Sequence, residues 1–233
     1  MSQASDSTDL SARLAAVDES IAAAARRAGR DPSSITRIVV TKFHPASLIR
    51  ELHSCGVRDV GENRQQELSA KTAETADLGE LRWHFVGQAQ TKKARAIRQS
   101  AAVVHSVDRE RLADAFERVA DDDRLLDVLM QVNLTDDEGR GGVNPDGIES
   151  LAEHIAGLST LRLRGIMAVA PLDEEPARAF ARLHGMAQQL LTVVPDADWI
   201  SAGMTADFVE AINAGATHLR IGSAITGSRP DRG

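Results

Sequence analysis

The sequence contains no tyrosine, one cysteine and few aromatic residues. Aromatic residues make up 3% of the 233 residues, so the core must be built from Ala, Leu, Ile and Val. The single cysteine, Cys55, excludes a disulfide within the chain and is typical of a reducing compartment. Because tyrosine is absent, no tyrosine hydroxyl of this chain can act as a general acid or base.

The sequence also lacks the features of a membrane or secreted protein. No apolar stretch approaches the roughly 20 residues that span a bilayer. Residues 1–10 are polar and acidic and contain no apolar core of a secretory signal. The net charge is −7 and no dense Lys/Arg cluster occurs, which argues against nucleic acid or an anionic membrane as the main partner. We therefore expect a cytoplasmic protein.

What the sequence does contain is a regular alternation of strand-like and helix-like segments. Apolar and β-branched runs predict strands over 35–41, 57–60, 81–86, 102–107, 125–134, 161–169, 199–201 and 218–221. Between them, helical patterns cover 46–55, 64–75, 91–99, 109–120, 145–157, 175–194 and 206–214. An Ala-rich amphipathic stretch from Leu10 to Arg30 predicts a further helix before the first strand.

This alternation predicts an α/β fold, namely a single-domain (β/α)8 TIM barrel with an extra N-terminal helix. The alternative is an open doubly wound sheet, but its Gly-rich phosphate loop and the Walker A sequence are both missing. We expect residues 1–9 to be disordered, residues 10–228 to form the barrel domain, and residues 229–233 to be a C-terminal tail.

Polar residues stand where several of the predicted strands end, while the strand interiors are expected to be apolar. Lys42 follows the first strand and Asn63 follows the second. TIM barrels keep their active sites at the C-terminal ends of their strands. These polar residues therefore predict a functional site at that end of the barrel.

The last two loops carry a pattern that fits a phosphate group. Ser201-Ala202-Gly203-Met204-Thr205 begins with the last residue of the seventh predicted strand and continues into the next loop, and Gly222-Ser223 follows the eighth strand. Small residues let backbone N–H groups approach an anion, and hydroxyls add donors. These two loops form the recurrent phosphate site of TIM barrels. Each motif alone is also ordinary turn chemistry.

Arg220 closes the eighth strand beside this pattern. One interpretation pairs it with a carboxylate at the rim, and another has it bind a ring nitrogen or an anionic group of a ligand. A lysine, a phosphate cradle and an arginine on one face of a barrel suggest pyridoxal phosphate, with Lys42 forming a Schiff base. His84, in an apolar strand, is more typical of a core histidine than of a site residue. The histidines lack the helical spacing of a metal site, so we expect no metal.

Several short motifs occur together in the order found in one known family. They are Val40-Thr41-Lys42, Gly61-Glu62-Asn63, Trp83-His84-Phe85-Val86-Gly87, Gln131-Val132-Asn133, Gly203-Met204-Thr205 with Asp207, and Arg220-Ile221-Gly222-Ser223-Ala224-Ile225. Each motif is weak alone, but together they are specific, and the match runs from Leu10 to Gly227. The sequence resembles the pyridoxal phosphate homeostasis proteins, relatives of the N-terminal barrel domain of alanine racemase.

The resemblance implies a barrel that binds pyridoxal phosphate as an aldimine on Lys42. It assigns the phosphate to Ser201, Gly222 and Ser223 with Thr205 nearby, the pyridine nitrogen to Arg220, and a place beside the ring to Asn63. Some positions depart from the family pattern, among them the usual serine before Asp207, where Thr205 preserves a hydroxyl. Thr91 stands where an asparagine is usual, and Thr226 stands where an aromatic residue is common.

The resemblance also implies a protein without a well-established catalytic activity. The related racemase uses a lysine and a tyrosine from a second domain on opposite faces of its substrate. This sequence has no tyrosine, and we expect no second domain after the last strand. An arginine opposite the ring nitrogen also weakens the cofactor as an electron sink. Our leading hypothesis is a monomer that buffers pyridoxal phosphate or delivers it to apoenzymes.

Two alternatives stay open at this point. One is a weak racemase or lyase that uses pyridoxal phosphate on an amino acid, with His84 or a partner chain as the second proton-transfer group. The other is a phosphate-binding barrel that acts on a sugar phosphate, with Lys42 as the Schiff-base lysine of an aldolase.

Overall fold

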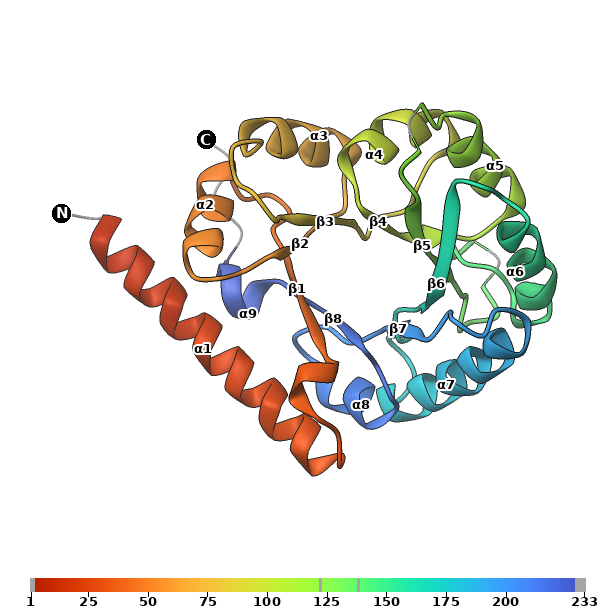
Figure 1. Ribbon diagram of the computed structural model, residues 1–233. Helices are drawn as coiled ribbons and strands as arrows, with labels where there is room; N and C mark the ends of the chain where they lie inside the picture. Colours follow the sequence, from red (N-terminus) through yellow and green to blue (C-terminus); the bar gives the residue numbers. More distant parts are fainter. Residues whose placement is uncertain (1–2, 122, 138, 229–233) are drawn as a thin grey trace.

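The chain folds into a closed barrel of eight parallel strands. The computed structural model describes residues 3–121, 123–137 and 139–228. The strands are β1 (Thr36–Val40), β2 (Asp59–Glu62), β3 (Arg82–Phe85), β4 (Val103–Val107), β5 (Leu126–Gln131), β6 (Leu161–Met167), β7 (Trp199–Ser201) and β8 (His218–Ile221). Each strand pairs with its neighbours in sequence, and β8 pairs with β1 to close the ring (Figure 1). The predicted TIM barrel is confirmed, and the open sheet is wrong.

Helices surround the ring of strands and connect each strand to the next. They are α1 (Gln3–Arg27), α2 (Ala46–Ser54), α3 (Gln65–Glu74), α4 (Ala94–Ser100), α5 (Glu110–Arg118), α6 (Ile148–Ala156), α7 (Pro176–Val193), α8 (Phe208–Asn213) and α9 (Ser223–Thr226). The described part of the chain also contains the short 3-10 helices η1 (Pro32–Ser34), η2 (Thr91–Lys93) and η3 (Pro145–Gly147). The sequence pattern did not predict α9, because four residues are too few to show a helical period.

The first helix is longer than the sequence pattern predicted. It begins at Gln3 rather than at Leu10, so residues 3–9, which we expected to be disordered, are helical in the structure. An ion pair between Asp9 and Arg13, one helical turn apart, supports this early start. Residues 1–2 and 229–233, the remainder of the expected disorder and the expected tail, lie outside the described residues.

Two arginines, Arg13 in α1 and Arg30 three residues after its end, tie this N-terminal segment to the outside of the barrel. Arg13 donates from Nε to the carbonyl oxygen of Ile225 at 2.7 Å, and Arg30 donates from Nη1 to the carbonyl oxygen of Ala216 at 2.7 Å. The helix therefore lies against α8 and α9, across the outside of the ring (Figure 1).

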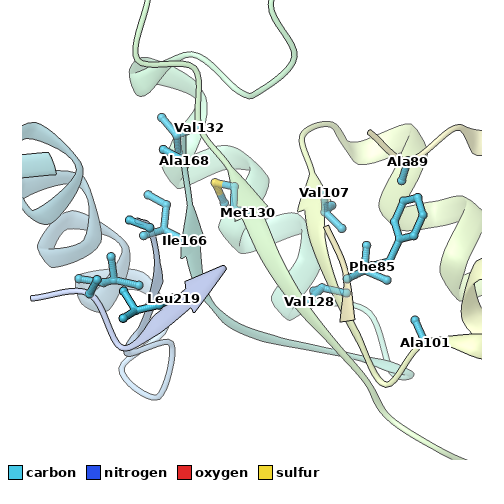
Figure 2. Packing of buried hydrophobic residues seen from close by; sticks show 14 of the residues in the cluster. Phe85, Ala89, Ala101, Val107, Val128, Met130, Val132, Ile166, Ala168 and Leu219 are labelled. Atoms are coloured by element: carbon cyan, nitrogen blue, oxygen red, sulfur yellow. The ribbon is translucent and has the colours of Figure 1, made fainter. Parts of the chain in front are cut away.

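The main hydrophobic core lies between the strands and the helices. Figure 2 shows residues of this layer, among them Phe85, Val128, Met130, Ile166 and Leu219, all of which are buried. Alanine, leucine, isoleucine and valine make up most of this core, as the scarcity of aromatic residues predicts. Within the described ranges, no helix is both long and apolar enough to cross a membrane.

Candidate functional site

Lys42 lies at the C-terminal rim of the barrel, two residues after β1 ends, with its side chain exposed. Its Nζ lies 5.9 Å from the centroid of the Phe43 ring. Because β1 lies between β2 and β8 in the ring, the loop that carries Lys42 lies between the loops that carry Asn63 and Gly222. The fold thus brings three of the predicted site residues to adjacent positions on one rim.

A buried ion pair supports the backbone beneath Lys42. Lys71 of α3 donates to Glu62 Oε1 at 2.6 Å and to the carbonyl oxygen of Thr41 at 2.9 Å, and the Thr41 hydroxyl donates to the same Glu62 oxygen at 2.6 Å. The Glu62 side chain is fully buried and the Lys71 side chain is 7% exposed. Burial raises the pKa of Glu62, although the hydrogen bonds from Lys71 and Thr41 act against this change. The sequence reasoning missed this pair.

Phe43, the residue after Lys42, is also held by a contact with α3. The backbone N–H of Phe43 donates to Glu67 Oε2 at 2.8 Å, and Lys71 Nζ lies 3.3 Å from that oxygen. Phe43 has φ of +71°, a left-handed conformation that costs a bulky residue about 1–3 kcal/mol. The residues on both sides of Lys42 are therefore fixed by contacts with α3.

Asn63 follows β2 and is half-buried at the rim. Its Oδ1 is buried and has no hydrogen-bond partner among the described residues. The loop after β3 packs directly on its backbone, since a Cβ built at Gly87 would lie 2.0 Å from the Asn63 carbonyl oxygen. A glycine at position 87 therefore allows the contact that places Asn63.

We expect Gly87→Ala to displace Asn63 and to destabilise the fold. The added methyl group meets backbone rather than a flexible side chain, so the cost should reach at least about 1–3 kcal/mol, the usual range for overpacking. Urea denaturation measures this loss. Gly79→Ala is the control, because a Cβ there meets no atom within 4 Å. Equal stability of the two variants would contradict the prediction.

Arg220 lies in β8 with its guanidinium inside the barrel. It donates from Nη1 to Ser201 Oγ at 2.7 Å and from Nη2 to the carbonyl oxygen of Ala168 at 2.9 Å. Burial lowers the pKa of Arg220 to about 10, and the charge of Asp207 acts in the opposite direction. No described carboxylate forms a hydrogen bond with this guanidinium, so the interpretation as a rim ion pair is not supported.

Ser201 has different contacts from those that the phosphate pattern predicts. Its side chain is fully buried, and its Oγ bonds to Arg220 and to His105 Nδ1, the latter at 3.0 Å. His105 Nε2 in turn lies 3.0 Å from His84 Nδ1, and His84 Nε2 lies 2.9 Å from Asp59 Oδ1. The expectation of apolar strand interiors is therefore wrong for this barrel. The interpretation of His84 as a core histidine agrees with its complete burial.

The other predicted phosphate residues lie at the rim. Thr205 and Ser223 are exposed, and neither hydroxyl bonds to any residue that the structure describes. Gly222 directly precedes α9. The loop before α8 is ordered by Asp207, whose Oδ1 accepts from the Met204 N–H at 2.6 Å and whose N–H donates to the Met204 carbonyl oxygen at 3.2 Å. These loops leave donors available for a ligand.

The buried histidines make the stability of the fold depend on pH. Burial lowers the pKa of His218 to about 3 from an ordinary value of 6.5, and burial also lowers the pKa values of His84 and His105. At a pH between about 3 and 6.5, His218 binds a proton in the unfolded chain but not in the folded chain. The free energy of unfolding must therefore fall as the pH falls below 6.5.

We expect each of these histidines to contribute a slope of up to ~1.4 kcal/mol per pH unit to the free energy of unfolding. Denaturation by urea at several pH values between about 7 and 5 measures this slope. His218→Gln should reduce the slope, because it removes the histidine whose pKa burial lowers to about 3. A stability that stays constant over this range would contradict the prediction.

The rim residues fit pyridoxal phosphate. The exposed amine of Lys42 is available to an aldehyde, and the buried guanidinium of Arg220 offers donors to a ring nitrogen. Burial of Asn63 Oδ1 without a hydrogen-bond partner among the described residues costs free energy unless a ligand donates a hydrogen bond to it. Among the described residues no group of three or more His, Cys, Asp or Glu side chains is placed to hold a metal ion.

The comparisons with known proteins agree with this geometry. Residues 13–230 match the family model described as the N-terminal domain of alanine racemase. The pyridoxal phosphate homeostasis protein of Pseudomonas aeruginosa is 42% identical over 220 residues, which cover 93% of this chain and 94% of that protein. The protein of the same name from Escherichia coli K12 is 39% identical over 228 residues, which cover 95% of this chain and 97% of that protein.

One solved structure with a similar fold contains a bound ligand. The structure of PipY from Synechococcus elongatus with pyridoxal phosphate bound superposes with a TM-score of 0.83 at 33% identity, covering 94% of this chain and all of that one. The resemblance found in the sequence is confirmed by a family model and by relatives that match almost the whole chain. The chain belongs to the pyridoxal phosphate homeostasis proteins, a family built on the barrel of the alanine racemase N-terminal domain.

Proposed function

We propose that this chain binds pyridoxal phosphate at its C-terminal rim and serves in the homeostasis of this cofactor, as a buffer or a carrier. One observation carries the proposal. Arg220, whose buried guanidinium has no hydrogen-bonded carboxylate among the described residues, lies one strand away from the exposed Lys42. A buried charge of this kind needs a partner, and a ring nitrogen would supply an acceptor.

Each rim residue has a role in this proposal. The aldehyde of bound pyridoxal phosphate condenses with a lysine amine, with loss of water, to form a carbon–nitrogen double bond. Lys42 supplies the amine, and the contacts of Thr41 and Phe43 with α3 hold it at the rim. Arg220 donates to the ring nitrogen, and Asn63 accepts beside the ring.

The phosphate group would lie in the loops after β7 and β8. The Gly222 and Ser223 backbone and the Ser223 hydroxyl are its donors, with Thr205 nearby. Ser201 remains part of the proposed site, but its hydroxyl meets Arg220 and His105 in this structure, so we infer that it acts on the ring side through Arg220. The bound form thus has a covalent attachment at one end and hydrogen bonds at the other.

A racemase or lyase needs a second proton-transfer group on the opposite face of the ring. His84 does not suit this role, because it is fully buried and both of its ring nitrogens are hydrogen-bonded, to Asp59 and to His105. We therefore favour binding without turnover of amino acids.

We further propose that the protein acts in the cytoplasm as a monomer and passes the cofactor to apoenzymes. A single, exposed cysteine is typical of a reducing compartment. The net charge of −7 disfavours nucleic acids and anionic membranes as partners. The exposed amine of Lys42 keeps the attachment point within reach of an acceptor.

Titration of the purified protein with pyridoxal phosphate tests the proposal. We expect saturable visible absorbance, transfer of the cofactor to an added apoenzyme, and no racemisation or cleavage of amino acids by chiral chromatography. A protein that stays colourless with excess cofactor would sink the binding proposal. Turnover comparable to that of true enzymes would replace the carrier with a catalyst.

A further inference from the structure

A continuous line of hydrogen bonds crosses the interior of the barrel. It joins Asp59 at the start of β2, His84 of β3, His105 of β4, Ser201 of β7 and Arg220 of β8, with successive distances of 2.9, 3.0, 3.0 and 2.7 Å. We refer to these five residues as the relay. TIM barrels usually fill this space with branched apolar side chains. The relay places five polar side chains there instead.

The ends of the relay determine the direction of every hydrogen bond in it. Burial alone would raise the pKa of Asp59, but the hydrogen bond from His84 and nearby positive charge bring it below its ordinary value, so the carboxylate only accepts. His84 therefore donates from Nε2. Since burial lowers the pKa values of both histidines, each carries a single ring proton at neutral pH.

The remaining directions follow from this starting point. With its proton on Nε2, His84 accepts at Nδ1 from the Nε2–H of His105. His105 then accepts at Nδ1, so the Ser201 hydroxyl must donate to it. The lone pairs of Ser201 Oγ remain for the Nη1–H of Arg220, which can only donate. One order satisfies all five side chains, with Arg220 as the first donor and Asp59 as the last acceptor.

The two ends of the relay have different surroundings. His84, His105 and Ser201 are fully buried, and Arg220 is 5% exposed. The Asp59 side chain is 25% exposed and borders a cavity of about 520 Å³ between α1, η1 and the starts of β1 and β2. This cavity lies at the N-terminal end of the barrel, opposite to the rim that carries Lys42. The relay therefore links a solvent-accessible carboxylate at one end to the guanidinium that serves the rim.

We propose that Asp59, His84 and His105 are positioning residues that orient Ser201 and, through it, the guanidinium of Arg220 toward the ligand. This inference rests on the proposed binding of pyridoxal phosphate. Without His105 Nδ1 as its acceptor, the Ser201 hydroxyl would rotate freely. The lone pairs of Ser201 Oγ would then no longer be directed at Arg220 Nη1. A change at Asp59, on the opposite end of the barrel, thereby alters ligand binding at the rim.

The order of the relay is testable without any ligand. In nitrogen-labelled protein, heteronuclear NMR distinguishes the two neutral forms of histidine. We expect both His84 and His105 to carry the proton on Nε2 and to show bare Nδ1 atoms. A proton on Nδ1 of either residue in the folded protein would overturn the inference.

The effect on the rim is measured as affinity for pyridoxal phosphate. Asp59→Ala removes the last acceptor and should weaken binding about tenfold or more, the equivalent of one hydrogen bond to a charged group. Asp59→Asn keeps an acceptor oxygen for His84 and should restore most of that affinity. The double variant His105→Leu/Ser201→Ala should bind pyridoxal phosphate no worse than the weaker of the two single variants, because each single change already interrupts the relay.

Asp127→Asn provides the matched control. Asp127 is also buried at the N-terminal end of the barrel, and it pairs with Arg82 and Arg162 instead of a histidine. This variant should lose stability with little change in affinity. If Asp59→Ala binds as tightly as the wild-type protein, or no less tightly than Asp127→Asn, the positioning role is wrong. If the wild-type protein itself does not bind pyridoxal phosphate, the proposed function fails, and the NMR result alone then decides the order of the relay.

Discussion

Lys42→Ala should abolish covalent capture of pyridoxal phosphate while leaving the fold intact. The side chain is exposed, and its removal breaks none of the hydrogen bonds that fix Thr41 and Phe43. The wild-type protein, treated with pyridoxal phosphate and then borohydride, should gain the mass of one reduced cofactor and lose its visible absorbance band. The variant should show neither the mass gain nor the band. Its phosphate and ring contacts should still support weaker, reversible binding.

The small number of lysines makes this experiment decisive. The chain has only Lys42, Lys71, Lys92 and Lys93, so peptide mapping assigns a reduced adduct to one of four positions. Lys71 is buried in its ion pair with Glu62, whereas Lys92, on η2, is exposed. Lys92→Ala is therefore the matched control and should retain the full adduct. An adduct that persists in Lys42→Ala, or that maps to Lys92 or Lys93, would refute the assignment.

The barrel and the rim lysine were predictable because both depend on local pattern. Alternating strand-like and helix-like runs define the order of the elements, and the closed ring follows from it. Lys42 stands out because a charged residue directly after an apolar strand must lie at a strand end. The early start of α1 at Gln3 was not predictable in the same way, because residues 3–9 are too polar to show an apolar period.

The relay was not predictable from the sequence because its members are far apart in the chain. His84 and His105 each look like isolated histidines in apolar strands, and their partners come from β2 and β7. A signal existed nonetheless. Asp59, His84, His105, Ser201 and Arg220 all lie within strands rather than after them, and alternation along a strand determines which side chains point inward. Ser201 was predicted at the end of the seventh strand, where it lies in β7, but its role was assigned from the phosphate-loop motif that begins with it.

The buried ion pair between Glu62 and Lys71 was not predictable from the sequence either. Glu62 lies within a motif that the sequence comparison noted, but its partner Lys71 lies in α3 and has no distinctive sequence context. Only the packing of α3 against the end of β2 brings the two charges to 2.6 Å. The pair supports Thr41 and Glu67, so it connects the stability of the fold to the position of the functional lysine.

Lys71→Met should destabilise the protein by about 3–5 kcal/mol, because it leaves the Glu62 carboxylate buried without its cation. A loss of this size is a large fraction of the stability of an ordinary domain and is measured by urea denaturation. The pKa of Glu62 is already raised by burial, so the variant should recover part of its loss at low pH, where Glu62 is protonated, and lose it again as the pH rises.

Two further variants separate this effect from a general loss of an ion pair. Arg50→Met breaks the exposed pair between Arg50 and Asp77, whose atoms are 2.7 Å apart, and should cost far less stability, because water screens an exposed ion pair. The double variant Glu62→Gln/Lys71→Met removes the stranded charge and should be more stable than Lys71→Met alone. If Lys71→Met costs no more than Arg50→Met, the buried pair does not support the rim, and the position of Lys42 must depend on the strand end and the Glu67 contact with Phe43 instead.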